Sequence, residues 1–142
     1  MGTLADELAL NRLMARYVDA ANRRDAEGWS STWAEDGCWR LMGTEVTGRE
    51  RILGLWQQVL AGFEFALLMP SSGHFNIDGD TASGHWYLQE FTRDHEGVAA
   101  AALSRYSDRC VKVGGEWLFA RREYDVLYRG PADLSGEYKP LP

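Results

Sequence analysis

The sequence of 142 residues has few of the residues that form covalent or metal-bound frameworks, with two cysteines and four prolines. Cys38 and Cys110 lie far apart, form no CxxC motif and belong to no His/Cys cluster with zinc spacing. We therefore expect two reduced, buried thiols and no bound metal. No window approaches the roughly 20 apolar residues of a membrane span, and the acidic start MGTLADELAL does not resemble a signal peptide. These absences predict a soluble, cytoplasmic protein with no membrane contact.

Positive charge is also scarce, since 15 Lys and Arg face 21 Asp and Glu and give a formal net charge of −6. Without a basic stripe, binding to nucleic acid is not expected. The chain has no GxSxG, P-loop or GxGxxG motif, so neither serine catalysis nor a nucleotide or nicotinamide cofactor is indicated. Aromatic residues are abundant, with six Trp, six Tyr and five Phe. They could fill a core or line a cavity for a flat apolar ligand.

Helical spacing of apolar residues predicts three helices in the first half of the chain. The first covers residues 3–24, with Thr3 as its cap and Glu7 supporting the first turn. A short second helix follows Asp25 and ends at Asp36–Gly37, and the third covers GRERILGLWQQVLAGF, residues 48–63. Between the last two, CWRLMGTEVTG indicates a short strand or hairpin.

From residue 64 onward the pattern is that of strands joined by tight turns. EFALLM is an apolar run that Pro70 should stop, and HFNI, TASGHWYLQEFTRD, VAAAALSRYSDRCVKV and WLFARREYDVLYR follow. Three helices before an antiparallel meander make an α+β domain, and long strands curl into a cone that the helices close. We expect a single domain over residues 1–142, with a core at about 4–129 and a loose surface tail at 130–142.

Five segments in order carry a resemblance to a known family: RYVDAANRRDAEGWSSTWAEDGCW, VTGRERI, HFNIDGDTASGHWYL, RYSDRC and GGEWLFARRE. The order resembles SnoaL-like proteins of the NTF2-like, cystatin-like group, which includes scytalone dehydratase, dehydrochlorinases, bile-acid dehydratases and polyketide cyclases. The resemblance covers about residues 4–129. It implies the cone fold, whose members include lyases, isomerases, cyclases and non-catalytic subunits.

The resemblance also implies a catalytic constellation. In dehydratase-like members a tyrosine of the first helix is followed by two acids, and here this frame reads Tyr17, Asn22 and Asp25. The first acid normally pairs with a pocket histidine, whose place His74 takes. We therefore expect His74 to move the proton, Asn22 to orient it, and Tyr17 to donate to a developing oxyanion.

Alternation along the strands leaves open which side chains face the interior. His74 and Asn76 share one face of their strand, while Phe75 and Ile77 share the other. On the next strand His85 alternates with Ser83, Tyr87, Gln89 and Phe91. The opposite set is Ala82, Gly84, Trp86, Leu88 and Glu90.

The remaining assignments concern the pocket wall, one tyrosine and one arginine. The expected pocket residues are Trp39, Val18, Met69, Trp56 and Trp86. Tyr106 matches a recurring family tyrosine to which we assign a structural role. Arg122 matches a recurring arginine and is expected to pair with a helix acid such as Asp25 or Asp36.

The sequence therefore favours a small cofactor-free lyase, isomerase or cyclase that acts by acid–base chemistry on a hydrophobic, ring-containing molecule. The alternative is a non-catalytic ligand-binding or accessory protein, which the amide at position 22 favours. Abundant aromatics and an uncovered outer sheet face further predict a homodimer formed through the sheets.

Overall fold

The computed structural model describes residues 2–133 and 136–137, and the helices precede most of the sheet as expected. Residues 134–135 and 138–142 of the predicted tail lie outside the described part. The elements in chain order are α1 (Leu4–Arg23), α2 (Ala26–Ser30), β1 (Trp33–Leu41), β2 (Thr44–Thr47), α3 (Arg49–Ala61), β3 (Phe63–Asp78), β4 (Thr81–Asp94), β5 (Ala99–Val113) and β6 (Glu116–Pro131).

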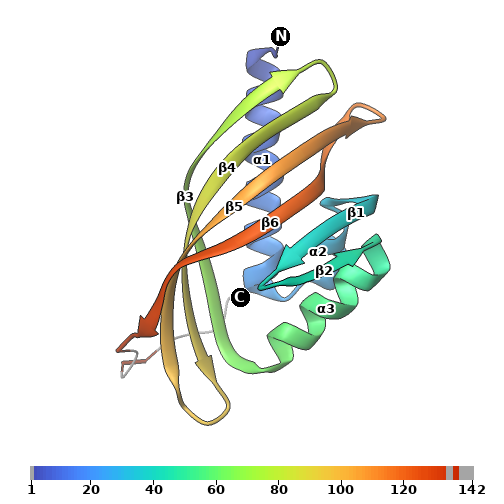
Figure 1. Ribbon diagram of the computed structural model, residues 1–142. Helices are drawn as coiled ribbons and strands as arrows, with labels where there is room; N and C mark the ends of the chain where they lie inside the picture. The colour runs from blue at the N-terminus through green and yellow to red at the C-terminus, as the bar shows by residue number, and fades with distance from the viewer. Residues whose placement is uncertain (1, 134–135, 138–142) are drawn as a thin grey trace.

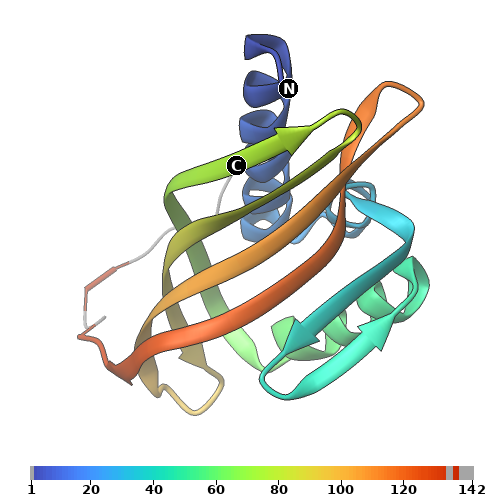
Figure 2. The same cartoon turned by 45° about the horizontal axis from the view of Figure 1, so that its top comes forward.

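One six-stranded sheet forms the scaffold, with strand order β2-β1-β6-β5-β4-β3. The meander from β3 to β6 is antiparallel throughout, whereas β1 pairs with β6 in parallel. The long strands curve strongly without closing, and the helices lie on the concave side (Figures 1 and 2). The expected α+β cone with helices on a curved, mostly antiparallel sheet is therefore confirmed.

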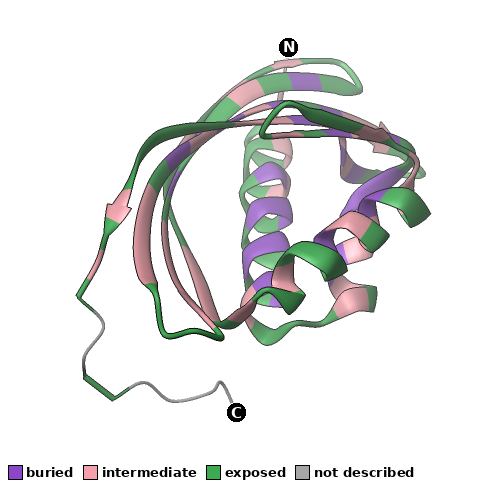
Figure 3. Ribbon diagram, turned by 60° about the horizontal axis from the view of Figure 1, so that its bottom comes forward, coloured by how far each residue is buried: buried purple, intermediate pink, exposed green. Residues whose placement is uncertain are grey.

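Helix α1 runs along the inside of the curved sheet and supplies much of the core (Figure 3). A capping box begins it, because the Thr3 side chain accepts from the Asp6 backbone and the Asp6 carboxylate accepts from Thr3. Asp6, and not Glu7, thus completes the first turn. The helix ends at Arg23, and the cap residue Arg24 that follows has a left-handed backbone with a φ of 56°. Its buried stripe consists of Leu10, Leu13, Met14, Tyr17, Val18, Ala20 and Ala21.

Two boundaries differ from the sequence prediction. The second helix ends at Ser30, and Trp33 already begins β1, whereas a helix to Asp36 was expected. Trp33 instead pairs with Phe119 of β6. Likewise β3 passes through Pro70, where the pairing with β4 shifts register before Gly73. Because β3 is an edge strand, a residue without an N–H is tolerated there.

Both cysteines are free, with Cys110 buried and Cys38 half-buried, so the expectation of two buried thiols holds fully only for Cys110. Among the described helices none is long and apolar enough to cross a membrane.

Candidate functional site

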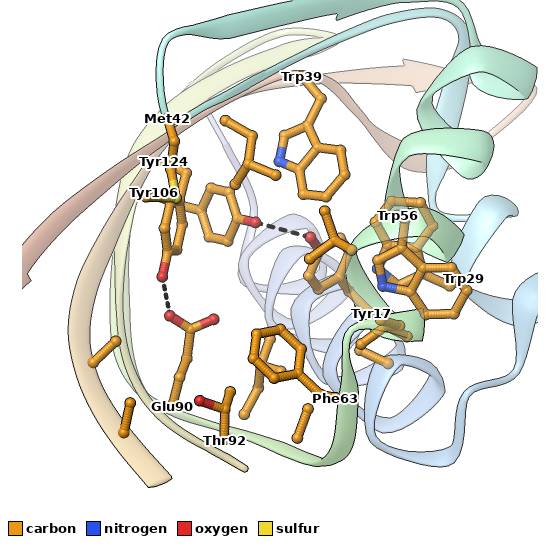
Figure 4. A pocket seen from close by; sticks show the side chains of 18 of the residues that line it. Tyr17, Trp29, Trp39, Met42, Trp56, Phe63, Glu90, Thr92, Tyr106 and Tyr124 are labelled. Atoms are coloured by element: carbon orange, nitrogen blue, oxygen red, sulfur yellow. Dashed lines mark hydrogen bonds between the residues drawn. The ribbon is translucent and has the colours of Figure 1, made fainter. Parts of the chain in front are cut away.

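A cavity of about 180 Å³ lies between the concave face of the sheet and the three helices (Figure 4). Every layer of the fold contributes to its wall. An apolar cavity of about 150 Å³ is enough to hold a benzene ring, so this space matches a small ring compound. Its lining consists of Tyr17, Ala21, Trp29, Trp39, Leu41, Met42, Trp56, Val59, Leu60, Phe63, Ala66, Leu68, Glu90, Thr92, Ala100, Ala102, Tyr106, Tyr124 and Arg129.

Tryptophans from three elements build one side of the cavity. Trp29 of α2 and Trp56 of α3 are stacked, with ring centroids 4.5 Å apart and planes 8° from parallel. The ring centroid of Trp39, on β1, lies 5.4 Å from that of Trp29. Ala100 and Ala102 of β5 lie on the sheet side of the cavity, where their small side chains leave room for a ligand. The arrangement offers flat apolar surfaces to a ring.

Glu90 of β4 places a carboxyl group in this apolar lining. Its Oε2 accepts hydrogen bonds from the Tyr124 hydroxyl and, at 3.1 Å, from the Ser104 hydroxyl. Figure 4 shows the other carboxyl oxygen, Oε1, pointing toward the middle of the cavity. Burial raises the pKa of Glu90 above its ordinary value of 4.5, although both hydrogen bonds and the positive charge of Arg129, which also lines the cavity, act in the opposite direction. The carboxyl group therefore holds its proton to a higher pH than an exposed glutamate does, as a general acid–base group in a site should.

Two tyrosine hydroxyls meet at the cavity wall, and we call Tyr17 and Tyr106 the tyrosine pair. Their oxygens are 3.0 Å apart, and either can be the donor. Burial is the main cause that raises the pKa of both groups, so both stay protonated. Since the mutual bond uses one of the two protons, the second remains for an oxygen of a ligand.

A buried ion pair supports the tyrosine pair from behind. Arg122 bonds Asp108 through Nε at 2.7 Å and Nη2 at 2.9 Å, and both side chains are buried. Its guanidinium lies 3.7 Å from the ring centroid of Tyr106 and 4.4 Å from that of Tyr17. The expected pairing with Asp25 or Asp36 is therefore wrong. Asp108, on the neighbouring strand directly opposite Arg122, is the partner.

His74 lies outside the cavity, which corrects the expectation that it faces the interior. It is exposed on the outer face of β3, directly opposite His85 of β4. Phe75 and Ile77 instead face inward and pack against the core. The Trp86 ring fixes this choice, because it lies so close to Gly73 that any side chain there would collide with it. His74 follows Gly73 and so points the other way.

Asn22 is half-buried and does not meet His74. Its Nδ2 donates to the Leu68 carbonyl at 2.9 Å, and its Oδ1 accepts from the Leu68 N–H at 2.8 Å. The amide thus joins α1 to the edge strand β3, and the proposed His74–Asn22 contact does not form.

The other expected pocket residues divide into three groups. Trp39 and Trp56 line the cavity, as does Tyr17, which was expected to donate to the ligand. Val18 and Trp86 are buried in the packed core outside that lining. Met69 is 47% exposed on the outer face of β3.

Glu90 is the functional candidate that sequence reasoning missed. It shares a strand face with Trp86 and Leu88, which are both buried. A carboxylate that continues an apolar strand face is itself a signal, because an ionisable group is seldom buried without a function or partner. The family resemblance drew attention to His74 instead.

No group of three or more His, Cys, Asp or Glu side chains within residues 2–133 and 136–137 is arranged to hold a metal ion.

Comparison with known proteins finds one matching family model and many solved structures with a similar fold. A family model described as SnoaL-like domain matches residues 2–123. No curated protein matches the chain.

Solved structures with the same architecture include a putative scytalone dehydratase from Novosphingobium aromaticivorans, at 20% identity and a TM-score of 0.83, covering 92% of this chain and 90% of that one. A hexachlorocyclohexane dehydrochlorinase, LinA type 2, is 18% identical with a TM-score of 0.88, covering 96% and 95%. A Nostoc punctiforme protein of unknown function with a cystatin-like fold is 24% identical with a TM-score of 0.73, covering 87% and 92%. At such identities the likeness establishes the fold.

Proposed function

The chain belongs to the SnoaL-like domain family, and from this premise we propose that it converts a hydrophobic, ring-containing small molecule inside its cavity by acid–base chemistry without a cofactor. The observation that carries the proposal is the combination of an aromatic wall with one half-buried carboxyl group whose pKa is raised. Lyase, isomerase and cyclase reactions all need a proton moved next to a carbonyl or a leaving group. The similar structures named as a dehydratase and a dehydrochlorinase are compatible with that class.

The machinery differs from the one expected from the sequence. A proton carrier has to touch the bound molecule, and the exposed His74 does not line the cavity, whereas Glu90 and the tyrosine pair do. The substrate ring would lie against Trp29, Trp39 and Trp56. The polar groups of the lining would bind its oxygen and exchange its proton.

A non-catalytic ligand-binding protein is the second candidate, and Asn22 favours it. Both ends of the Asn22 amide are bonded to the Leu68 backbone, so position 22 supplies neither a charge nor a partner for a proton carrier. Both candidates require the cavity to bind a ring compound, whereas only the first requires turnover.

Filling the cavity tests the requirement that both candidates share. Ala102→Leu places a larger side chain in the lining, while Ala101→Leu changes the neighbouring residue, which does not line the cavity. We expect uncharged ring ketones such as 2-indanone to quench tryptophan fluorescence of the wild type. Ala102→Leu should weaken this binding by about tenfold or more, or about 1.4 kcal/mol, and Ala101→Leu should leave it nearly unchanged.

Equal binding by the two variants would place the ligand elsewhere and contradict the proposal. Turnover then separates the two candidates: a bound ketone that undergoes no proton exchange identifies a binding protein.

A further inference from the structure

We propose that Glu90 is the catalytic base and the tyrosine pair the oxyanion-binding group, and that the substrate is a cyclic ketone with an acidic C–H next to its carbonyl. The inference rests on the proposed function and deepens it, since it names the reacting atoms and the substrate class. It stands on the contacts of three polar groups that the fold brings into one apolar space.

The first step is the asymmetry of the Glu90 carboxyl. Tyr124 and Ser104 both donate to Oε2, so this oxygen is anchored on strands β6 and β5. Oε1 points into the cavity (Figure 4). A base held by one oxygen and open at the other has a fixed direction of attack, which lowers the entropic cost of reaching the reacting geometry.

The second step is the position of the tyrosine pair. Tyr17, Tyr106 and Glu90 all line the same cavity, and Figure 4 shows the hydrogen bond between the two hydroxyls above the Glu90 carboxyl group. Burial is the largest cause that raises the pKa of Tyr17 and Tyr106, and the negative charge of Glu90 is a smaller cause that acts in the same direction on both hydroxyls. A ligand whose oxygen lies at the tyrosine pair therefore shares one cavity of about 180 Å³ with the Glu90 carboxyl group.

The third step is the charge behind the tyrosine pair. The Arg122 guanidinium lies against both rings and is held in place by Asp108. A cation over an aromatic face draws electron density from the ring and makes its hydroxyl a better donor. The fold thus aims a positive potential at the point where a negative oxygen would form. Arg122 touches neither ligand nor reacting atom and is a positioning residue.

The reaction is balanced without any further reactant. Oε1 removes the proton from the carbon next to the carbonyl, the C–H electron pair forms the C=C bond, and the carbonyl π pair moves onto oxygen. That oxygen accepts a hydrogen bond from the tyrosine hydroxyl that is not used in the mutual bond, and the hydrogen stays on the tyrosine. Protonated Glu90, after exchanging its proton with solvent or directly, then gives a proton to the same carbon or, in an unsaturated ketone, to the end of the conjugated system. The C=C electron pair forms the new C–H bond, and the electron pair on oxygen forms the carbonyl again. The second outcome is an isomerisation.

The test measures hydrogen exchange directly, so the natural substrate is not needed. Wild-type protein is incubated in D₂O with 2-indanone, cyclohexanone or cyclohex-3-enone, and deuterium uptake next to the carbonyl is followed by NMR. We expect wild-type exchange above the buffer rate, rising with pH as Glu90 loses its proton. Glu90→Gln should lower the protein-dependent rate by about 100-fold or more, while fluorescence quenching by the ketones persists.

Two controls make the outcome specific. Glu123→Gln removes a glutamate on β6 that does not line the cavity, and it should leave exchange unchanged. Tyr17→Phe removes one hydroxyl of the tyrosine pair and should slow exchange more than it weakens ketone binding. Ketones that bind the wild type but exchange no faster than with Glu90→Gln would overturn the inference and leave a binding protein. Absence of ketone binding would overturn both the inference and the proposed function.

Discussion

At the scale of single residues, Asn22 shows how one side chain can be fixed by backbone alone. Its amide donates to the carbonyl of Leu68 and accepts from the N–H of the same residue. Only an amide offers a donor and an acceptor in this geometry, since a carboxylate has two acceptors. The residue is therefore matched to the β3 backbone, and an aspartate would be mismatched.

We predict that Asn22→Asp destabilises the protein. The Leu68 N–H can still donate to the new carboxylate, but the Leu68 carbonyl loses its donor and faces a negative oxygen. The expected loss in free energy of unfolding is about 1–3 kcal/mol, measured by urea denaturation. Asn11→Asp is the matched control on the same helix, because Asn11 is exposed, and it should change stability by no more than about 0.5 kcal/mol. An unchanged or raised stability of Asn22→Asp would contradict the structural role.

The residues of the site show what sequence reasoning could and could not reach. The sequence predicts Trp39 and Trp56 as pocket residues and Tyr17 as a donor to the ligand, and all three side chains line the cavity. His74 was misplaced because a period of two gives two faces without saying which is inner. That choice depends on Gly73 and Trp86, which meet across two strands. Contacts of this kind are not visible in a local pattern.

At the scale of elements, the long helices and the antiparallel meander followed from spacing and turn residues. The two wrong boundary predictions occurred where pairing between strands overrides the local conformational preference of the sequence. Trp33 lies four residues after Trp29, as in a helix, yet it forms the start of β1 because β6 offers it a parallel partner. Pro70 ends neither β3 nor its pairing, because β3 has a free edge.

The start of α1 is tied to the sheet by a contact that no local rule contains. Asp6 accepts from Trp117 Nε1 and from Lys112 Nζ, each at 3.1 Å. These hydrogen bonds, together with those from Thr3, hold the pKa of Asp6 well below its usual value. The contribution to stability is therefore present above the ordinary pKa of an aspartate and is lost as pH falls through the lower folded value.

At the scale of the whole molecule, the cavity exists because one end of the concave face is filled by packed side chains and the other end is not. α1 fills the cone near the β3–β4 turn with packed apolar side chains. Toward the other end, the alanines of β5 and the tryptophans of α2, α3 and β1 leave open space. Composition could suggest an aromatic-lined hollow, but its place and contents required the packing of many side chains.

The outer face of the sheet carries apolar side chains that motivate the predicted homodimer. Met69, Leu103 and Tyr128 lie in one row across the strands, and each is between 46% and 48% exposed. Such a row would be removed from water if a second copy packed on it. We expect a dimer mass by light scattering at micromolar concentration. Leu103→Lys should shift it toward the monomer, and Leu8→Lys, an exposed leucine of α1, should not. A monomeric wild type would contradict this expectation.

The central claim is that the Glu90 carboxyl group exchanges a proton inside an apolar cavity. A ¹³C NMR titration of the glutamate carboxyl groups tests this claim most directly. Glu90→Gln identifies the resonance by its disappearance. Because burial outweighs the hydrogen bonds from Tyr124 and Ser104, the account predicts that this resonance titrates above the ordinary pKa of 4.5, while exposed glutamates titrate near it. A Glu90 resonance that titrates together with the exposed glutamates, or below them, would contradict the account.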